Sequence, residues 1–171
     1  FHSYEGGASG GTLETMFSMG ELDLGDDLTN PFLLNPEDSY SNEQKQLSGD
    51  RVGISKKPEI KAWSGPFIMA TANTRVVRRS EALLALRQES YGSNFTYQEH
   101  AYHKSWLSAV SSLLLTGLSV LVLLSPLKRL VKPFLPKPGE GPSEAVQENG
   151  WFDCKFIAES EDGTKSVFNM H

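Results

Sequence analysis

The sequence predicts an α+β protein in which a mixed sheet with flanking helices is accompanied by one long apolar segment. Short apolar runs bounded by proline, glycine and asparagine alternate with stretches of helical period. The chain of 171 residues is 39% hydrophobic and 22% charged, which is typical of one folded domain of ordinary size. The apolar segment is a run of eighteen residues without a charge, Leu107 to Leu124.

The first 34 residues are expected to form a glycine-rich turn and a helix. Ser9 is placed to cap this helix, and the apolar residues Leu13, Met16, Phe17 and Leu24 follow at helical spacing. Two Asn-Pro pairs and many polar residues then predict an irregular surface connection over residues 35–58.

Residues 59–105 are predicted to form a strand-helix-strand unit. The first strand is the apolar run 67–72, and the second lies over residues 94–103, where residues alternate in "NFTYQEHAYH". The helix between them runs from about Thr74 to Gln88. Its apolar stripe is separate from an arc about 100° wide that holds three arginines. These are Arg75, Arg78 and Arg79.

Residues 106–126 form the apolar segment, which as a straight helix of eighteen residues would be about 27 Å long, close to the roughly 30 Å of a bilayer core. The residues expected to contact lipid are Trp106, Leu113, Leu114, Leu115, Gly117, Leu118, Leu121, Leu123 and Leu124. Lys128, Arg129 and Lys132 follow and are expected to hold anionic headgroups. We expect the segment to enter one leaflet or a lipid-droplet monolayer and to return near Gly117. A buried core helix is the alternative.

The remainder of the chain is read as a basic proline- and glycine-rich linker over residues 127–142 and a final unit over residues 143–171. Ser143 and Gly150 bound a short helix in this unit, and Asp162-Gly163 predicts a hairpin turn.

The charge pattern predicts where an anionic partner binds. Net charge is −9 over residues 1–50, +9 over residues 51–137 and −5 over residues 138–171. A phosphate, a lipid headgroup or an acidic protein would therefore meet the middle block, unless the blocks neutralise one another in the fold. Nucleic acid is not among the expected partners.

Metal and nucleophile chemistry find little support in the sequence. The single cysteine, Cys154, excludes an internal disulfide and a cysteine-rich metal site. His100 and His103 have ligand spacing but no further ligand near them in sequence, so no metal is expected. No nucleophile and base pair is recognisable, and the catalytic residues are unknown.

Four stretches resemble saccharopine dehydrogenase-like oxidoreductases, in the lipid-associated branch that includes trans-acting enoyl reductases. They are "SGGT", "PFIMATANTRVVRRSEALL", "YGSNFTYQEH" and "PKPGEGPSEAVQENGWFDCKFIAESEDG", and the resemblance covers residues 6–168. It implies an NADP-dependent oxidoreductase that acts on a lipid or acyl-type substrate. It also implies association with the cytosolic face of a lipid droplet, the endoplasmic reticulum or the plasma membrane.

The resemblance is to the carboxy-terminal half of a two-domain, Rossmann-type protein. The family's G-x-G-x-x-G turn has no counterpart, because the cluster "GGASGG" has no strand in front of it. NADP is therefore implied for the full-length family and is not expected to bind this chain alone. A missing amino-terminal Rossmann domain is an expected partner, and the oligomeric state is not predicted.

Two groups of residues are candidates for binding a cofactor or substrate anion. Ser9, Gly10, Gly11 and Thr12 combine backbone N–H groups with hydroxyls at a helix start, which suits a phosphate or carboxylate, although a plain cap is the alternative.

The second group is the arginine arc, Arg75, Arg78 and Arg79, with Asn73 just before it. Arginine binds phosphate bidentately, and the asparagine could orient a carbonyl or amide. Pairing of the arginines with the protein's own acidic blocks is the alternative. At the level of function, the alternative is a non-enzymatic lipid-surface or single-pass membrane protein that lacks cofactor binding.

Overall fold

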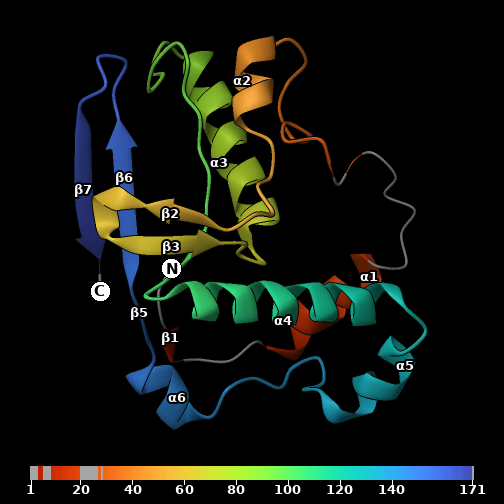
Figure 1. Cartoon of the computed structure of the whole chain (residues 1–171). Helices are drawn as coiled ribbons and strands as arrows, with labels where there is room; N and C mark the ends of the chain where they lie inside the picture. Colours follow the sequence, from red (N-terminus) through yellow and green to blue (C-terminus); the bar gives the residue numbers. More distant parts are fainter. Residues whose placement is uncertain (1–3, 6–8, 20–26, 28, 171) are drawn as a thin grey trace. The chain divides into compact units, whose positions relative to one another are not determined.

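The computed structural model describes residues 4–5, 9–19, 27 and 29–170 (Figure 1). The chain divides into two compact units. Unit 1 contains residues 1–23, 54–65 and 101–171. Unit 2 contains residues 24–53 and 66–100. The apolar positions expected at Met16, Phe17 and Leu24 lie outside the described residues or side chains.

All the described strands lie in unit 1 and pair antiparallel. β1 (Tyr4–Glu5) pairs with β5 (Trp151–Phe152), and β6 (Cys154–Glu159) pairs with β7 (Lys165–Met170). A sheet of three strands has the order β2 (Ser55–Lys57), β3 (Ala62–Gly65) and β4 (Ala101–His103). The α+β class is confirmed, but these small antiparallel sheets replace the expected mixed sheet. Short connections such as that between β2 and β3 permit only antiparallel pairing.

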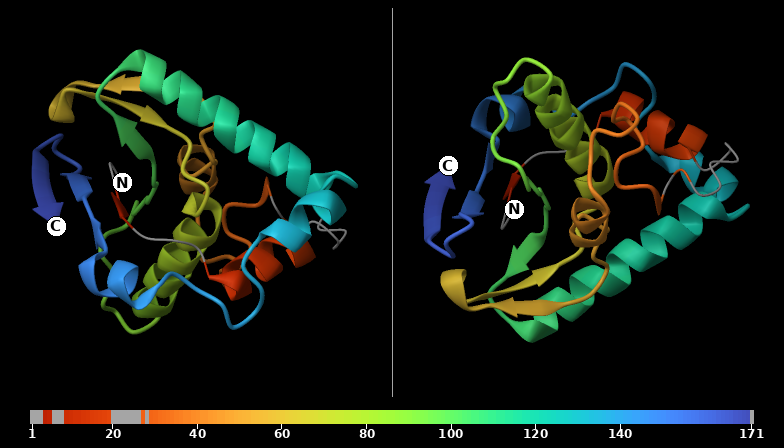
Figure 2. Two further views of the ribbon diagram at one scale, coloured as in Figure 1. Left: turned by 90° about the horizontal axis from the view of Figure 1, so that it is seen from below. Right: turned by 90° about the horizontal axis from the view of Figure 1, so that it is seen from above.

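The apolar segment forms one continuous helix, α4 (Trp106–Leu124), as Figure 2 shows. Ser105 caps it by accepting a hydrogen bond of 3.2 Å from the backbone N–H of Ser108. The expected return at Gly117 is therefore wrong, because one glycine costs a helix only about 1 kcal/mol. Among the helices that the structure describes, none combines the length and the hydropathy needed to cross a membrane.

One face of α4 packs on the three-stranded sheet. Ala109 is fully buried, and a Cβ added at Gly65 in β3 would lie 3.9 Å from the Ala109 carbonyl oxygen. Small residues on both sides thus let the helix backbone approach the strand closely. The other helices described in unit 1 are α1 (Gly10–Met19), α5 (Lys128–Val131), α6 (Glu144–Asn149) and the 3-10 turns η2 (Pro58–Ile60) and η3 (Lys132–Phe134). The predicted cap of α6 at Ser143 and its end at Gly150 are confirmed.

In the described residues of unit 2, the α-helices are α2 (Asn42–Leu47) and α3 (Ala70–Ala85), and irregular segments join them. The strand expected over residues 67–72 is wrong: Pro66 follows β3, and residues 67–69 turn directly into α3. The strand expected after Asn94 is also wrong over residues 94–100, since only 101–103 pair in a sheet. Alternation is a weak signal over so few residues. Side chains of Gln44 and Arg78, rather than a neighbouring strand, donate to the carbonyl oxygens of Phe95 and Tyr97.

The predicted hairpin turn at Asp162-Gly163 is confirmed, and Gly163 has the positive φ of 82° that favours glycine. The Asp162 carboxylate accepts hydrogen bonds from the Ser160 hydroxyl and from the Thr164 backbone N–H. These bonds, the Ser160 hydroxyl first, lower the pKa of Asp162 from 3.8 to about 2. The ionised form of the Asp162 carboxyl is therefore more stable in the folded turn than in the unfolded chain.

Acid is expected to loosen this turn. Because folding lowers the pKa of Asp162, its contribution to stability is present above pH 3.8 and is lost as the pH falls through about 2. An NMR titration of the Asp162 carboxyl signal should give a midpoint near 2, and Ser160→Ala should raise it. A midpoint near 3.8 in the unaltered protein would contradict this account.

Candidate functional site

Helix α3 buries its polar face. Thr74, Arg75, Arg78 and Glu81 are buried together with Ala82, whereas Val76 and Leu83 of the apolar stripe are exposed. The irregular segments of unit 2 explain this inversion. Their backbone carbonyls have no ladder partners, and a buried carbonyl needs a donor. Arginine side chains, with five N–H donors each, supply such donors.

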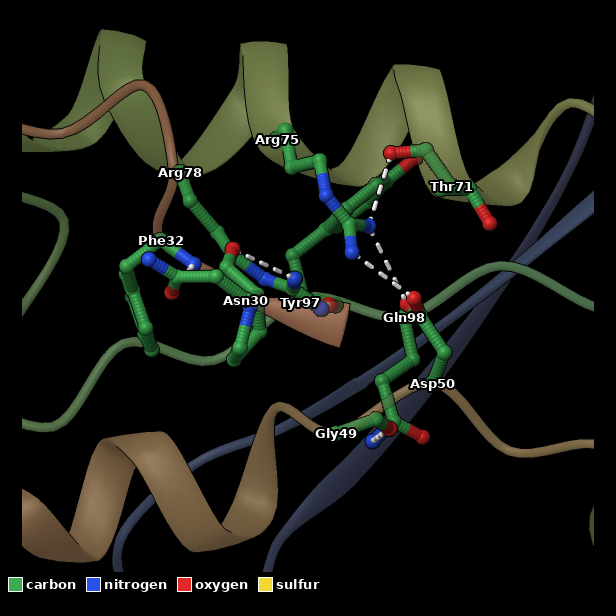
Figure 3. Close-up of polar contacts among 10 residues, drawn as sticks. Asn30, Phe32, Gly49, Asp50, Thr71, Arg75, Arg78, Tyr97 and Gln98 are labelled. Carbon is green, nitrogen blue, oxygen red and sulfur yellow. Dashed lines mark hydrogen bonds and ion pairs between the residues drawn. The ribbon is translucent and has the colours of Figure 1, made fainter. Parts of the chain in front are cut away.

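Arg75 forms the ion pair of this face (Figure 3). Its guanidinium donates to both carboxylate oxygens of Asp50, at 2.9 and 3.3 Å, and to the Thr71 carbonyl oxygen at 2.8 Å. Arg75 is 5% exposed and the Asp50 side chain 34% exposed, so the pair is shielded on the arginine side. This contact corresponds to the alternative in which the arginines pair with the protein's own acids.

Arg78 joins two irregular segments to α3. Nη1 donates to the Pro31 carbonyl oxygen at 2.9 Å, and Nη2 donates to the Tyr97 carbonyl oxygen at 2.7 Å. The guanidinium also lies 5.7 Å from the centre of the Phe32 ring. Burial lowers the pKa of Arg78 below its usual range. No carboxylate contacts its guanidinium in the part of unit 2 that the structure describes.

The other members of the predicted arginine group are also bonded within unit 2. Arg79 donates to the Leu34 carbonyl oxygen, and the Asn73 amide donates to a Glu99 carboxylate oxygen at 2.9 Å. Glu99 accepts a second bond from the Tyr97 hydroxyl at 2.9 Å. The four residues therefore lie along one helix, but their polar groups point to different partners.

Two structural features of unit 2 were missed from the sequence. Glu81, which is 8% exposed, holds the chain after α3 by accepting from the Ser90 hydroxyl and the Tyr91 backbone N–H. Ser41 and Gln44 form a reciprocal capping box at the start of α2, inside the segment read as irregular. The spacing of serine and glutamine was a usable signal for that helix. Nothing in the local sequence marks Glu81 as buried.

The predicted "SGGT" turn lies in unit 1 at the start of α1, and its polar groups are engaged. The Thr12 backbone N–H donates to the Ser9 hydroxyl at 3.2 Å, and the two hydroxyls are 3.0 Å apart. The Gly10 N–H donates to the Glu140 carbonyl oxygen at 2.8 Å. A Cβ at Gly10 would lie 1.8 Å from the Lys137 carbonyl oxygen, so the linker fills the space in front of the turn. Gly6 and Gly7 lie outside the described residues.

This turn does not fit a dinucleotide pyrophosphate. Such a group needs free N–H groups at a helix start and room for close approach. The N–H groups of Gly10 and Thr12 already have acceptors, and the backbone of residues 136–137 occupies the approach. We therefore derive no chemical step through a cofactor bound at this turn.

The residues expected to contact lipid differ in exposure. Trp106, Leu114, Leu115, Leu118 and Leu121 are exposed on α4, as is Gly117, whereas Leu113 is half-buried. The side chains of Leu123 and Leu124 lie outside those that the structure describes.

Of the expected headgroup residues, Lys132 forms an ion pair of 2.9 Å with Glu14. Arg129 is exposed and Lys128 half-buried.

The histidines and the cysteine do not form a metal centre in the described part of the chain, where no three His, Cys, Asp or Glu residues lie close enough to hold an ion. His103 contacts the Ser108 hydroxyl at 3.3 Å at the start of α4. Cys154 is buried at the start of β6.

Comparison with known proteins relates the chain to one named activity. It is 33% identical over 186 aligned residues, covering 98% of this chain, to a protein of Mycobacterium tuberculosis strain H37Rv that carries the provisional name of trans-acting enoyl reductase. The chain is similar to trans-acting enoyl reductases. Proteins of that name from Mycobacterium leprae and from Mycobacterium bovis strain BCG are 34% and 33% identical over 66% and 67% of the chain.

The similarity covers only part of these relatives. The chain spans 43% of the length of the Mycobacterium tuberculosis protein, 28% of the Mycobacterium leprae protein and 29% of the Mycobacterium bovis protein. No family model and no solved structure gives a significant match. The broader saccharopine dehydrogenase-like assignment and the Rossmann-type architecture find no support in these matches and stay predictions.

Proposed function

We propose that this chain is part of an oxidoreductase that reduces a carbon–carbon double bond in an acyl substrate. The observation that carries the proposal is the alignment of 98% of the chain, at 33% identity, with a relative named for enoyl reduction. An enoyl group takes up a hydride at one alkene carbon and a proton at the other. The substrate would thus be an α,β-unsaturated acyl group, and the product its saturated form.

The hydride donor would be a nicotinamide cofactor, and we propose NADP. The engaged N–H groups of the "SGGT" turn indicate that this turn is structural, so the cofactor would be held by residues other than Ser9 to Thr12. Enoyl reduction needs no nucleophile on the protein, because the cofactor carries the reducing equivalent. The amino-terminal Rossmann domain implied by the sequence resemblance stays the proposed cofactor-binding partner.

The test measures whether the full-length protein, expressed from its complete gene, consumes NADPH. NADPH fluorescence should fall on addition of a long-chain enoyl thioester, and mass spectrometry should show the acyl product two hydrogens heavier. The saturated thioester is the matched control and should consume nothing. A correctly folded protein that leaves both NADPH and the enoyl thioester unchanged would overturn the proposal.

We also propose that α4 binds a lipid surface. This surface would be the cytosolic face of a membrane or of a lipid droplet. Support comes from the outer face of α4, which holds the exposed residues Leu107, Leu114, Leu115, Leu118 and Leu121. Their spacing places them in an arc roughly 120° wide. The opposite face, with Ala109, packs on β3 and β4. A contiguous exposed apolar face of this kind marks a surface that contacts lipid or another protein.

The contacts of unit 1 favour a helix that lies along the lipid surface. Chain segments from before and after α4 touch each other: Lys165 in β7 pairs with Glu59 at 2.8 Å, and Lys155 lies 5.6 Å from the centre of the Tyr102 ring. A spanning helix would place these partners on opposite sides of the bilayer. Lys128 and Arg129, which follow α4, are suitably charged for anionic headgroups.

Vesicle flotation tests this docking surface with the intact protein. Leu114→Gln combined with Leu118→Gln should lower partitioning onto vesicles with anionic lipid by about tenfold or more, since each change removes apolar area from the lipid contact. Leu86→Gln is the matched control, because Leu86 is an exposed leucine outside α4.

Equal flotation of all three proteins would contradict lipid binding by α4. So would a wild-type protein that does not float but self-associates through this face in gel filtration.

The alternative function is a lipid-surface protein without catalysis, and the occupied "SGGT" turn is the observation that favours it. Lipid docking by α4 is common to this alternative and to the reductase. The two functions differ in the NADPH assay, where flotation with no reductant consumption would select the alternative.

A further inference from the structure

A small cavity in unit 2 borders the buried face of α3. Its volume is about 80 Å³, and its walls are the first turns of α3 together with three irregular stretches, 49–52, 66–67 and 98–100. Thr74 and Arg78 both line it and are each 2% exposed. The proposed reductase activity and the lipid docking of α4 make no use of this cavity.

Two residues that line the cavity each have one hydrogen-bonding group with no partner among the described residues. These groups are the Thr74 hydroxyl oxygen and Nε of Arg78. Both belong to nearly fully buried residues, where a polar group without a partner is costly. The hydroxyl can donate, and the N–H can only donate. A group that satisfies both atoms must therefore be an acceptor.

The charge around the cavity also favours an acceptor that is negative. Arg78 is a buried cation whose bonded partners are the Pro31 and Tyr97 carbonyl oxygens, and a buried charge needs a counter-charge. The two carboxylates in the wall are engaged elsewhere, Asp50 by Arg75 and Glu99 by Asn73 and Tyr97.

The cavity wall holds two arginines and two carboxylates. Arg51, which is exposed, and Arg78 line it together with Asp50 and Glu99. Arg75 is not a lining residue but pairs with Asp50, so that the wall and this neighbour together carry one more cation than carboxylates. The amino-terminal turns of α3 add the positive end of a helix of 16 residues, and Met69 at its N-cap provides no side-chain cap.

We propose that this cavity binds one small oxyanion group, a carboxylate or a phosphate, whose oxygens accept hydrogen bonds from the Thr74 hydroxyl and from Nε–H of Arg78. The site differs from the arginine arc that the sequence indicates. Arg75 pairs with Asp50, and Arg79 donates to the Leu34 carbonyl oxygen, so neither is assigned to the anion. Thr74, which the sequence did not indicate, is a binding residue in this proposal.

The experiment is an NMR titration of the full chain with inorganic phosphate and, separately, with sodium acetate. Sodium chloride at equal ionic strength is the reference for each. The backbone amide signals of residues 70–78 should shift saturably with at least one of the two anions and not with chloride. Phosphate alone, acetate alone or both would identify the group that the cavity accepts.

Thr74→Val keeps the side-chain shape, removes the hydroxyl and leaves no new group without a partner. Its dissociation constant for the effective anion should be about tenfold higher, the effect of one lost hydrogen bond. Thr96→Val is the matched control, because Thr96 is exposed in the same unit and is not among the lining residues; it should bind as the unaltered protein does.

Arg51→Gln, at an exposed position, should weaken binding by about threefold and lower its salt dependence. The proposal is overturned if neither anion shifts the signals of the unaltered protein beyond the chloride reference. It is also overturned if Thr74→Val binds as tightly as Thr96→Val. Both readouts are independent of NADPH consumption, so failure here is distinguishable from failure of the reductase proposal.

Discussion

Replacing Arg78 with methionine is expected to destabilise unit 2 by about 3 kcal/mol or more, because each hydrogen bond from a charged group contributes roughly 1.5–3 kcal/mol. The change removes the hydrogen bonds that Arg78 donates to the buried Pro31 carbonyl oxygen and to the part-buried Tyr97 carbonyl oxygen. Few apolar side chains of unit 2 are buried to compensate, Phe32 and Ala82 among the described residues. This unit depends on polar contacts to an unusual degree.

Hydrogen exchange of the α3 amides is the measurement. A loss of about 3 kcal/mol raises the opening equilibrium by about a hundredfold or more. The three tryptophans, Trp63, Trp106 and Trp151, all lie in unit 1, so their emission reports whether the effect extends beyond unit 2.

Arg87→Met is the control, since Arg87 is exposed just after α3 and its loss should cost about 0.5 kcal/mol or less. Equal exchange rates in the two variants would show that Arg78 does not hold the irregular segments.

Gly10→Ala is expected to lower the melting temperature by roughly 5–10 °C, which corresponds to about 2–4 kcal/mol in a chain of this size. The new Cβ would lie 1.8 Å from the Lys137 carbonyl oxygen and 2.8 Å from the Pro136 carbonyl oxygen. Both atoms belong to backbone and cannot turn aside as a side chain would. The start of α1 must therefore move away from the linker and lose the bond from Gly10 to Glu140.

Gly11→Ala separates this clash from the general effect of replacing a helical glycine. Among the described residues, its Cβ would meet the Ser9 hydroxyl alone, at 3.8 Å, which is ordinary contact. Alanine is favoured over glycine in a helix by roughly 0.5–1 kcal/mol, so the variant should be neutral or more stable. Tryptophan emission during heating measures both variants. A melting temperature for Gly10→Ala equal to that for Gly11→Ala would mean that the linker does not occupy the turn.

Local signals predicted the elements whose conformation is set by neighbours in sequence. The uncharged run forms α4, and Asp162-Gly163 forms the hairpin turn. Ser143 and Gly150 are the caps of α6. Each depends on caps, propensities or a positive φ within a few residues. The wrong strand over residues 67–72 rested on a short apolar run, and the strand that is wrong over residues 94–100 rested on alternation over few residues. A turn leading into α3 formed at the first, and irregular chain formed at the second.

The candidate site was predicted only in part. The sequence predicted a cluster of arginines on one arc of a helix, and these arginines do lie in α3. It did not indicate that Arg75 would meet Asp50, 25 residues earlier, or that Arg78 would donate to Pro31, 47 residues earlier. Thr74 carried no signal, because a single threonine in a helix is unremarkable until its surroundings are known.

The sequence by itself determined the class of the fold, the uncharged helix, the position of the arginines and the similarity to enoyl reductases. Only the tertiary structure decided which face of α3 is buried. Helical periodicity ranks faces by their apolar content, but burial follows the partners that are available. In unit 2 these are carbonyl oxygens of irregular chain, which arginine satisfies and valine cannot.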